Sequence, residues 1–335
     1  MRMKQRDTLL GIGLYGWVVL SLLLTGCGGV SQAQENAIAN KNAKMTPKIA
    51  NGCGKDAEVK AGDSEDETMT ADPRVANGNS MRDYYIHVPT GYNKTQSIPL
   101  VLVFHGTGAR GSDMEQVTGL SQLADQENFI VAYPQGLKDN NGQTFWASIG
   151  TTQQGIDEIR YVDDLLDNLE QSFCIDEQRI YATGFSNGGG MSWYLACNLP
   201  ERIAAFAPVS GNFYDLDTGC NIKKGVPILD VHGTGDTVVP YMGGPAPEKP
   251  DLPLPSVPQW LNEWAKRDHC AQGPNTFFQS GNVTGEEWIR CRDGSSIVHY
   301  RIEGGGHAWP VSLGGSPSAS ETIWNFFKQH PLTYS

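Results

Sequence analysis

Charge is scarce in this chain, and basic charge most of all. Charged residues make up 19% of the 335 positions, and the formal net charge is −12 at pH 7. No basic patch with interleaved aromatic residues occurs, which argues against nucleic acid or an anionic membrane surface as a partner. Internal repeats and breaks between folded domains are also lacking, so we expect one globular domain whose acidity serves solubility.

Long apolar runs are lacking except at the start of the chain. A basic stretch with Arg2, Lys4 and Arg6 precedes an apolar run over residues 9–24. This run is short for a membrane span and typical of a secretory signal. It ends in Leu-Thr-Gly-Cys27, which resembles a bacterial lipobox. We therefore expect residues 1–26 to be a lipoprotein signal peptide. Cys27 would carry a lipid anchor at the outer membrane or cell surface, with an ordinary signal peptide as the alternative.

The sequence has neither a C-x-x-C pair nor a His/Cys cluster, so we expect no metal site. Of its seven cysteines, six remain after Cys27, and an even number in an exported protein indicates three disulfides. Fifteen pairings are possible. The pairing of Cys270 with Cys291 is favoured because both flank a short hairpin-like segment.

Large apolar residues are nearly absent from residues 28–72, which become acidic toward their end. Such a composition cannot bury enough apolar surface to fold. We therefore predict a flexible acidic tether over residues 27–75, in which Cys53 would link the segment to the folded domain through a disulfide.

Residues 76–335 alternate apolar strands with amphipathic helices, which predicts a mostly parallel sheet with helices on both faces. This is the α/β class. The proline-rich residues 240–258 have no periodicity and are expected to form a loop. The predicted strands are 81–88, 99–104, 129–133, 179–183, 204–209, 226–232 and 297–302, and the predicted helices are about 113–127, 157–173 and 319–328.

The stretch Gly184-Phe-Ser186-Asn-Gly188 stands between the strand at 179–183 and a helix beginning near Met191. G-x-S-x-G in this context is the pattern of a nucleophile elbow, in which a sharp turn exposes the serine hydroxyl. The helix that follows directs its N–H groups at the same point. Ser186 is therefore the expected nucleophile.

A serine nucleophile needs a base, and the base needs an acid to orient it. Asp236 follows the strand ending at His232, and His307 follows the strand ending at Ile302. The order Ser186, Asp236, His307 is that of α/β-hydrolases. Asp230 and Glu303 are weaker candidates for the acid, because the first lies inside a strand and the second is too close to His307.

Two N–H groups are needed to bind the oxyanion. We expect them from Asn187, directly after the nucleophile, and from Thr107 in the loop that follows the strand 99–104. The same loop reads Gly106-x-Gly-x-x-Gly111, which also matches a dinucleotide fingerprint. The next strand, however, ends without the acid that would bind a ribose. No nucleotide and no other cofactor is therefore expected.

With these residues in place, the chain resembles the secreted feruloyl esterase and polyhydroxybutyrate depolymerase group of α/β-hydrolases. The resemblance implies cysteine positions like those of the feruloyl esterase branch, whereas Thr107 stands where depolymerases often have cysteine. It also implies aromatic residues near the cleft at Trp146 and Trp309, for which core packing is the alternative. Tyr241 and His105 join them as substrate-binding candidates, although His105 and His232 can also be backbone-bonded residues at strand ends. The segments that carry the resemblance are Val103–Gly106, Tyr133–Gly136, Val162–Asp164, Gly184–Gly189, Val231–Tyr241 and Gly306–Pro310.

The expected function is hydrolysis of plant cell-wall esters, feruloyl or acetyl-xylan, through an acyl-enzyme. The main alternative is a hydrolase of polyesters or hydroxyalkanoate oligomers. A serine peptidase is less favoured because the chain lacks a gating domain. A non-catalytic binding lipoprotein with a relic triad is the alternative from another class.

Overall fold

The computed structural model describes residues 51–75, 80–148, 155–211, 220, 222–246, 249–315 and 317–333. The expected signal peptide, Cys27 and the first part of the expected tether lie outside these residues. None of the helices in the described ranges is long and apolar enough to cross a membrane.

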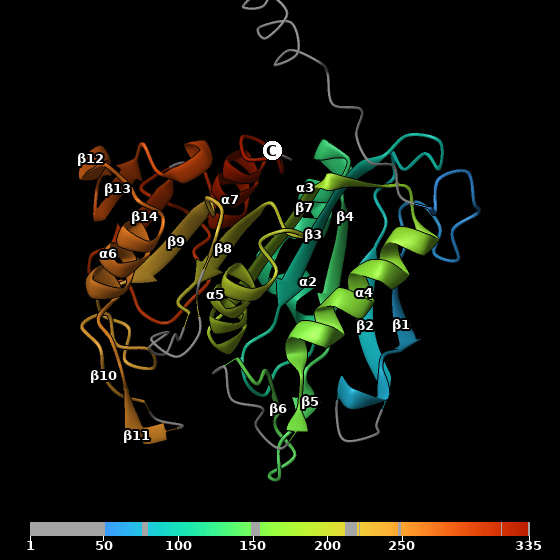
Figure 1. Ribbon diagram of the computed structural model, residues 1–335, viewed down its shortest axis with the longest axis horizontal. Coiled ribbons are helices and arrows are strands. Elements are labelled where there is room, and N and C mark those ends of the chain that lie inside the picture. The colour runs from blue at the N-terminus through green and yellow to red at the C-terminus, as the bar shows by residue number, and fades with distance from the viewer. Residues whose placement is uncertain are drawn as a thin grey trace, which may run out of the picture. The chain divides into compact units, whose positions relative to one another are not determined.

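A ten-stranded sheet forms the centre of the fold (Figure 1). Its six central strands, from β4 to β14, are parallel to one another, and two antiparallel strands extend each edge. The mostly parallel sheet is thus confirmed. The order across the sheet is β1 (Ser64–Thr70), β2 (Met81–His87), β4 (Ile130–Pro134), β3 (Ile98–Phe104), β7 (Ile175–Phe185), β8 (Ala205–Val209), β9 (Ile228–Gly233), β14 (Ile297–Ile302), β13 (Val283–Ile289) and β12 (Gln272–Ser280).

Helices cover both faces of the sheet and bury a separate core on each. Strand β3 shows why, since its residues alternate between the two cores: Leu100 and Leu102 face one, Val101 and Val103 the other. Helices α4 and α5 cross in front of the sheet in Figure 1. The first core is covered by α4 (Glu158–Ser172), α5 (Asn187–Asn198) and α6 (Val257–Arg267), and the second by α2 (Asp113–Thr118), α3 (Leu120–Glu127) and α7 (Ala319–Phe327).

Two helices differ in how well the sequence predicts them. The predicted helix 157–173 is α4, whose N-terminus is capped by the Asp157 side chain accepting from the Arg160 N–H. The predicted helix 113–127 is instead two helices, α2 and α3. Gly119 separates them with a left-handed φ of 63°, the conformation that commonly ends a helix.

The expected tether is wrong from residue 51 onward. Residues 64–70 form β1, which pairs with β2 along its whole length, and η1 (Pro73–Val75) follows. Val59, Met69 and Val75 are buried in the first core. Three of the acidic side chains that suggested a tether follow one another in this edge strand, where Glu65 and Asp66 are exposed and Glu67 is half-buried.

The prediction that the proline-rich residues 240–258 form a loop is also wrong. It contains the strand pair β10 (Gly244–Ala246) and β11 (Lys249–Leu254), and α6 begins at Val257. A second small strand pair, β5 (Leu137–Lys138) and β6 (Thr144–Phe145), was not predicted. Both are too short for a periodic apolar pattern to reveal them.

Three disulfides join Cys53 to Cys174, Cys197 to Cys220, and Cys270 to Cys291. The favoured pairing of Cys270 with Cys291 is confirmed, and the β12–β13 hairpin lies between them as expected. Cys53 does fasten its segment to the body of the protein. Three disulfides are typical of a protein that matures outside the reducing cytosol.

Candidate active site

Ser186 sits at the turn between β7 and α5 with φ 58° and ψ −120°. This region of backbone space is sparsely populated for a residue with a side chain. Its N–H donates to the Val209 carbonyl at 3.0 Å, which fixes the turn against the next strand. The Ser186 side chain is half-buried, so the hydroxyl is held at the carboxyl end of the sheet in the geometry of a nucleophile elbow.

The glycines on either side of Ser186 are required by close backbone contacts. A Cβ on Gly184 would lie 2.3 Å from the Gly188 carbonyl oxygen. A Cβ on Gly188 would lie 2.1 Å from the carbonyl oxygen of Phe104, at the end of β3. No side chain fits at either position, so the sequence pattern follows from the packing of helix α5 onto the strand ends.

Asp236 and His307 are brought together from two neighbouring strands, β9 and β14. The Nδ1 atom of His307 lies 2.7 Å from Oδ2 of Asp236. The other carboxylate oxygen of Asp236 accepts the N–H groups of Val238 and Val239, each at 2.8 Å. The carboxylate is therefore held in place before it orients the imidazole, as a Ser-His-Asp triad requires.

The loops that carry these two residues are fastened to each other. The Gly235 N–H donates to the Gly305 carbonyl at 2.9 Å, and the Gly304 N–H donates to the Thr234 hydroxyl at 2.8 Å. A Cβ on Gly233 would lie 2.2 Å from the Gly305 oxygen, so the two backbones pass in direct contact. The glycines before His307 thus serve close packing of the two loops.

The ring of Phe185 contacts the imidazole of His307. The rings of Phe185 and His307 have centroids 4.7 Å apart, and Phe185 immediately precedes Ser186. The His307 side chain is 16% exposed, so it remains open to solvent and substrate at this edge. Sequence reasoning missed Phe185, although its position beside the nucleophile could have suggested it.

His232, four positions before Asp236, is a backbone-bonded residue at a strand end, as expected. Its Nε2 donates to the Val239 carbonyl at 2.9 Å and lies 3.5 Å from Oδ2 of Asp236. Burial lowers the pKa of His232, but the carboxylates of Asp236 and Asp230 outweigh this and raise it. Burial raises the pKa of Asp236, whereas hydrogen bonds from His232, His307 and Val239 hold it well below its usual range. Asp236 is therefore an anion at neutral pH.

The two expected oxyanion donors lie on adjacent elements. Asn187 is the first residue of α5, where helix N–H groups have no intrahelical acceptor. Thr107 follows Gly106, whose missing Cβ would lie 3.3 Å from Cβ of Ser186. The loop after β3 therefore reaches the nucleophile closely enough for its backbone to bind an oxyanion formed there.

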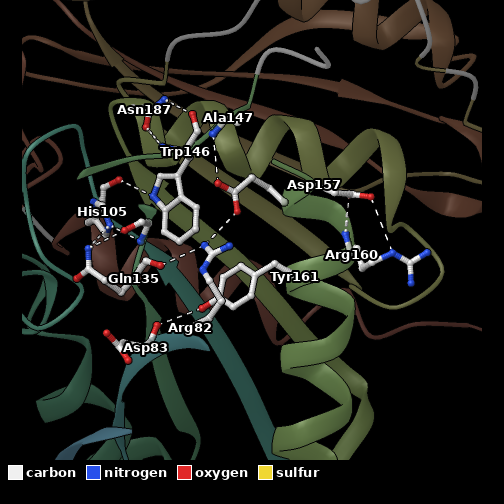
Figure 2. Close-up of polar contacts among 12 residues, drawn as sticks. Arg82, Asp83, His105, Gln135, Trp146, Ala147, Asp157, Arg160, Tyr161 and Asn187 are labelled. Carbon is white, nitrogen blue, oxygen red and sulfur yellow. Dashed lines mark hydrogen bonds and ion pairs between the residues drawn. The ribbon is translucent and has the colours of Figure 1, made fainter. Parts of the chain in front are cut away.

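The four expected substrate contacts are buried. His105 and Trp146 have exposures of 0% and 1%, and a role in contacting substrate is wrong for both because they leave no surface for a ligand. His105 bonds to Gly106 and Gly136, and the Trp146 indole donates to the His105 carbonyl at 3.0 Å (Figure 2).

Trp309 and Tyr241 are 7% and 6% exposed. The Trp309 indole N–H donates to the Ser320 hydroxyl, and the Tyr241 hydroxyl is 3.0 Å from Nε2 of His299. Core packing, the alternative for the tryptophans, describes Trp146 and Trp309. Sequence alone could not separate a cleft aromatic from a core aromatic at these positions.

The competing acids do not approach His307 in the structure. Asp230 is fully buried and lies 2.8 Å from Nδ1 of His299, while Glu303 is exposed. Among the described residues, the group of potential metal ligands that lies close together is Asp268, Cys270 and Cys291. Its two cysteines are joined in a disulfide, so they offer no thiolate.

Comparison with known proteins shows similarity to esterases. Residues 90–249 match the phospholipase/carboxylesterase family. Feruloyl esterase B of Piromyces equi is 30% identical over an alignment of 259 residues that covers 75% of this chain and 46% of that protein. Probable feruloyl esterase C of Aspergillus terreus is 28% identical over an alignment of 288 residues that covers 83% of this chain and 90% of that protein.

Among solved structures, the acetyl xylan esterase from Aspergillus awamori superposes with a TM-score of 0.57 at 17% identity. The match covers 79% of this chain and 99% of that one. At this identity the likeness shows the α/β-hydrolase fold. The chain spans about half of the length of the Piromyces relative, 46%.

Proposed function

From its similarity to feruloyl esterases, we propose that the chain is a serine carboxylic-ester hydrolase of the feruloyl esterase group of α/β-hydrolases, acting on plant cell-wall esters of the feruloyl or acetyl-xylan type. One observation carries the proposal: Nδ1 of His307 lies 2.7 Å from Asp236, and the same imidazole packs on Phe185, the neighbour of Ser186. This arrangement supports Ser186 as nucleophile, His307 as base and Asp236 as the acid that orients it.

In the first half of the reaction, His307 takes the proton of the Ser186 hydroxyl as its oxygen attacks the ester carbonyl carbon. The carbonyl π electrons move to the oxygen, and the N–H groups of Asn187 and Thr107 stabilise the resulting oxyanion. The oxyanion then collapses, the bond to the alcohol oxygen breaks, and His307 returns the proton to the leaving alcohol. The acyl group remains on Ser186.

In the second half, His307 takes a proton from water, whose oxygen attacks the acyl carbon. Collapse of the second oxyanion releases the carboxylic acid, and the proton returns to Ser186. Asp236 stays ionised and stabilises the imidazolium in both halves, which its lowered pKa allows. No cofactor enters the sequence of steps.

The names of the relatives support the substrate class, since they are feruloyl and acetyl xylan esterases. A substrate panel tests it: methyl ferulate, acetylated xylan and hydroxybutyrate oligomers, assayed with the wild type and with Ser186→Ala. We expect turnover of the first or second substrate and a loss of orders of magnitude in the variant. Turnover of the hydroxybutyrate oligomers alone would instead identify a polyester hydrolase.

The proposed location is the outer membrane or cell surface, with a lipid on Cys27. The Leu-Thr-Gly-Cys27 sequence and the three disulfides support export and anchoring. A bacterial host fed an alkynyl fatty acid should label the full-length protein and leave Cys27→Ser unlabelled. Equal labelling of both, or of neither, would exclude this anchor.

A further inference from the structure

The two expected oxyanion donors come from separate parts of the chain, Thr107 after β3 and Asn187 at the start of α5. Hydrogen-bond donors stabilise an oxyanion well only if they are fixed before the negative charge develops. Reorienting them during the reaction would cost the free energy that they contribute to the transition state. The structure must therefore hold two segments far apart in sequence at one spacing. Residues 144–148, here called the bridging segment, lie between them.

On one side, the bridging segment binds the loop that carries Thr107. The Gly108 N–H donates to the Thr144 carbonyl at 2.7 Å, and the Thr144 hydroxyl donates to the Ala109 carbonyl at 2.6 Å. The Trp146 indole N–H adds a third bond, to the His105 carbonyl at 3.0 Å. The loop is thus held along its length by this one segment.

On the other side, the bridging segment binds the side chain of Asn187. The amide oxygen of Asn187 accepts the Trp146 N–H at 2.7 Å, and its amide nitrogen donates to the Trp146 carbonyl at 3.1 Å. Figure 2 shows Trp146 between Asn187 and His105, bonded to both. Trp146 therefore sets the distance between Asn187 and the loop that carries Thr107.

The His105 ring controls the orientation of the donor on Thr107. Its Nε2 accepts the Gly136 N–H at 2.9 Å, so the proton of the neutral ring is on Nδ1. That Nδ1–H donates to the Gly106 carbonyl at 2.7 Å. The carbonyl of Gly106 and the N–H of Thr107 belong to one planar trans peptide and point in opposite directions. Because the Gly106 oxygen is held toward the His105 ring, the N–H of Thr107 points away from that ring.

The charge state of His105 agrees with this bonding. Burial lowers the pKa of the ring to about 4, against a smaller upward effect of its bond to Gly106. The ring therefore stays neutral, with one donor and one acceptor, over the pH range in which the enzyme would work. A protonated ring would lose the acceptor that Gly136 requires. The Gly106 oxygen also accepts the Ala109 N–H at 3.2 Å, which closes the turn.

We propose that His105 and Trp146 are positioning residues that fix the oxyanion hole, His105 by orienting the Gly106–Thr107 peptide and Trp146 by joining that loop to Asn187. The proposal rests on the proposed function. It predicts that changes at either residue weaken transition-state stabilisation more than substrate binding.

The test compares His105→Gln, His105→Asn and Trp146→Phe on a p-nitrophenyl ester. The asparagine amide occupies the place of Nδ1 and can still bind the Gly106 oxygen, whereas the glutamine amide reaches the place of Nε2 and cannot. We expect kcat to fall about 10- to 100-fold in His105→Gln and about 10-fold in Trp146→Phe, with KM nearly unchanged, since losing a whole donor costs about 10²–10³. His105→Asn should retain several times the kcat of His105→Gln.

Two further readouts separate positioning from general packing. An aryl trifluoromethyl ketone, which forms an oxyanion on the serine, should bind more weakly by the same factor as kcat/KM falls. Trp264→Phe is the matched control, because Trp264 is also fully buried but its indole N–H has no acceptor among the residues that the structure describes. It should keep its kcat, whatever its thermal midpoint.

The proposal is overturned if kcat follows the thermal midpoint across all four variants, or if His105→Gln and His105→Asn are equally active. It is also overturned if ketone binding is unchanged while kcat falls. An unaffected kcat in His105→Gln, together with an inactive Ser186→Ala, would remove this proposal and leave the proposed function intact. An active Ser186→Ala would remove the proposed function itself.

Discussion

Ser186 shows at the level of a single residue how the site is built from backbone contacts. Its φ of 58° and ψ of −120° carry an energetic cost of about 1–3 kcal/mol. The strained conformation persists because Gly184 and Gly188 pack so closely against backbone oxygens that a Cβ atom at either position would clash. The strain exposes one hydroxyl at the end of β7, where a base from β14 can approach it.

The first prediction concerns the charge of Asp236. Replacement by Asn keeps the shape but removes the anion that holds Nδ1 of His307, so the imidazole can adopt the wrong tautomer. We expect kcat for Asp236→Asn to fall by about 10³–10⁴-fold. Glu303→Gln, the exposed acid in the loop of His307, is the matched control and should retain near-wild-type kcat. Comparable losses in both variants would show that Asp236 is not the acid of the triad.

At the scale of the element, sequence reasoning succeeded where the signal was local. The elbow, helix α4 and strand β14 each carry their pattern within a few residues, and the sequence predicts all three. Strand β1 was missed because it is an edge strand with a single strongly buried side chain, Met69. Its stability comes from β2 beside it, which no local pattern reveals.

Local patterns do not reveal long-range contacts, and this also explains the site residues that were interpreted wrongly. Trp146 was expected near the cleft from the family resemblance, and His105, in the segment Val103–Gly106, was a candidate for substrate binding. Their burial depends on the β5–β6 pair folding back over the loop after β3, which is a long-range contact. The Ser186, Asp236 and His307 positions could be predicted because their order and strand ends follow from the fold class alone.

The second prediction concerns Asp268, the C-cap of α6. The carboxylate accepts the Val226 N–H and the Ser295 hydroxyl and is fully buried. Burial raises its pKa to about 7, against smaller opposing effects of these bonds. The folded protein therefore binds one proton more than the unfolded chain between about pH 4 and 7, so stability falls as pH rises through this window.

Urea unfolding of the wild type and Asp268→Asn at pH 5 and pH 8 measures this effect. We expect the wild type to lose about 1–3 kcal/mol more of its unfolding free energy between these two pH values than the variant does. Equal losses would mean that Asp268 ionises in the folded state as it does in the unfolded chain.

For the whole molecule, the third prediction concerns where the folded domain begins. A chain starting at residue 76 lacks β1 and the Cys53–Cys174 disulfide, and it exposes the edge of β2. A chain starting at residue 51 keeps both. We expect the shorter chain to be less stable by about 3 kcal/mol or more, from the loss of the disulfide and of the buried Val59, Met69 and Val75.

The two truncations are compared by chemical denaturation under oxidising conditions, so that the only difference is residues 51–75. If the chain that starts at residue 76 is as stable as the longer one, residues 51–75 would be a tether after all. The aryl-ester kcat of the longer chain provides the reference for a correctly folded site.

The fourth prediction follows from the account of the whole molecule as an enzyme that forms an acyl-enzyme on Ser186. The most direct measurement is rapid acid quenching of the protein during turnover of an aryl ester, followed by mass spectrometry of the intact chain and its peptides. The account predicts an added acyl mass on the peptide containing Ser186, and none in Ser186→Ala. Turnover without any adduct, or an adduct on another residue that persists in Ser186→Ala, would contradict it.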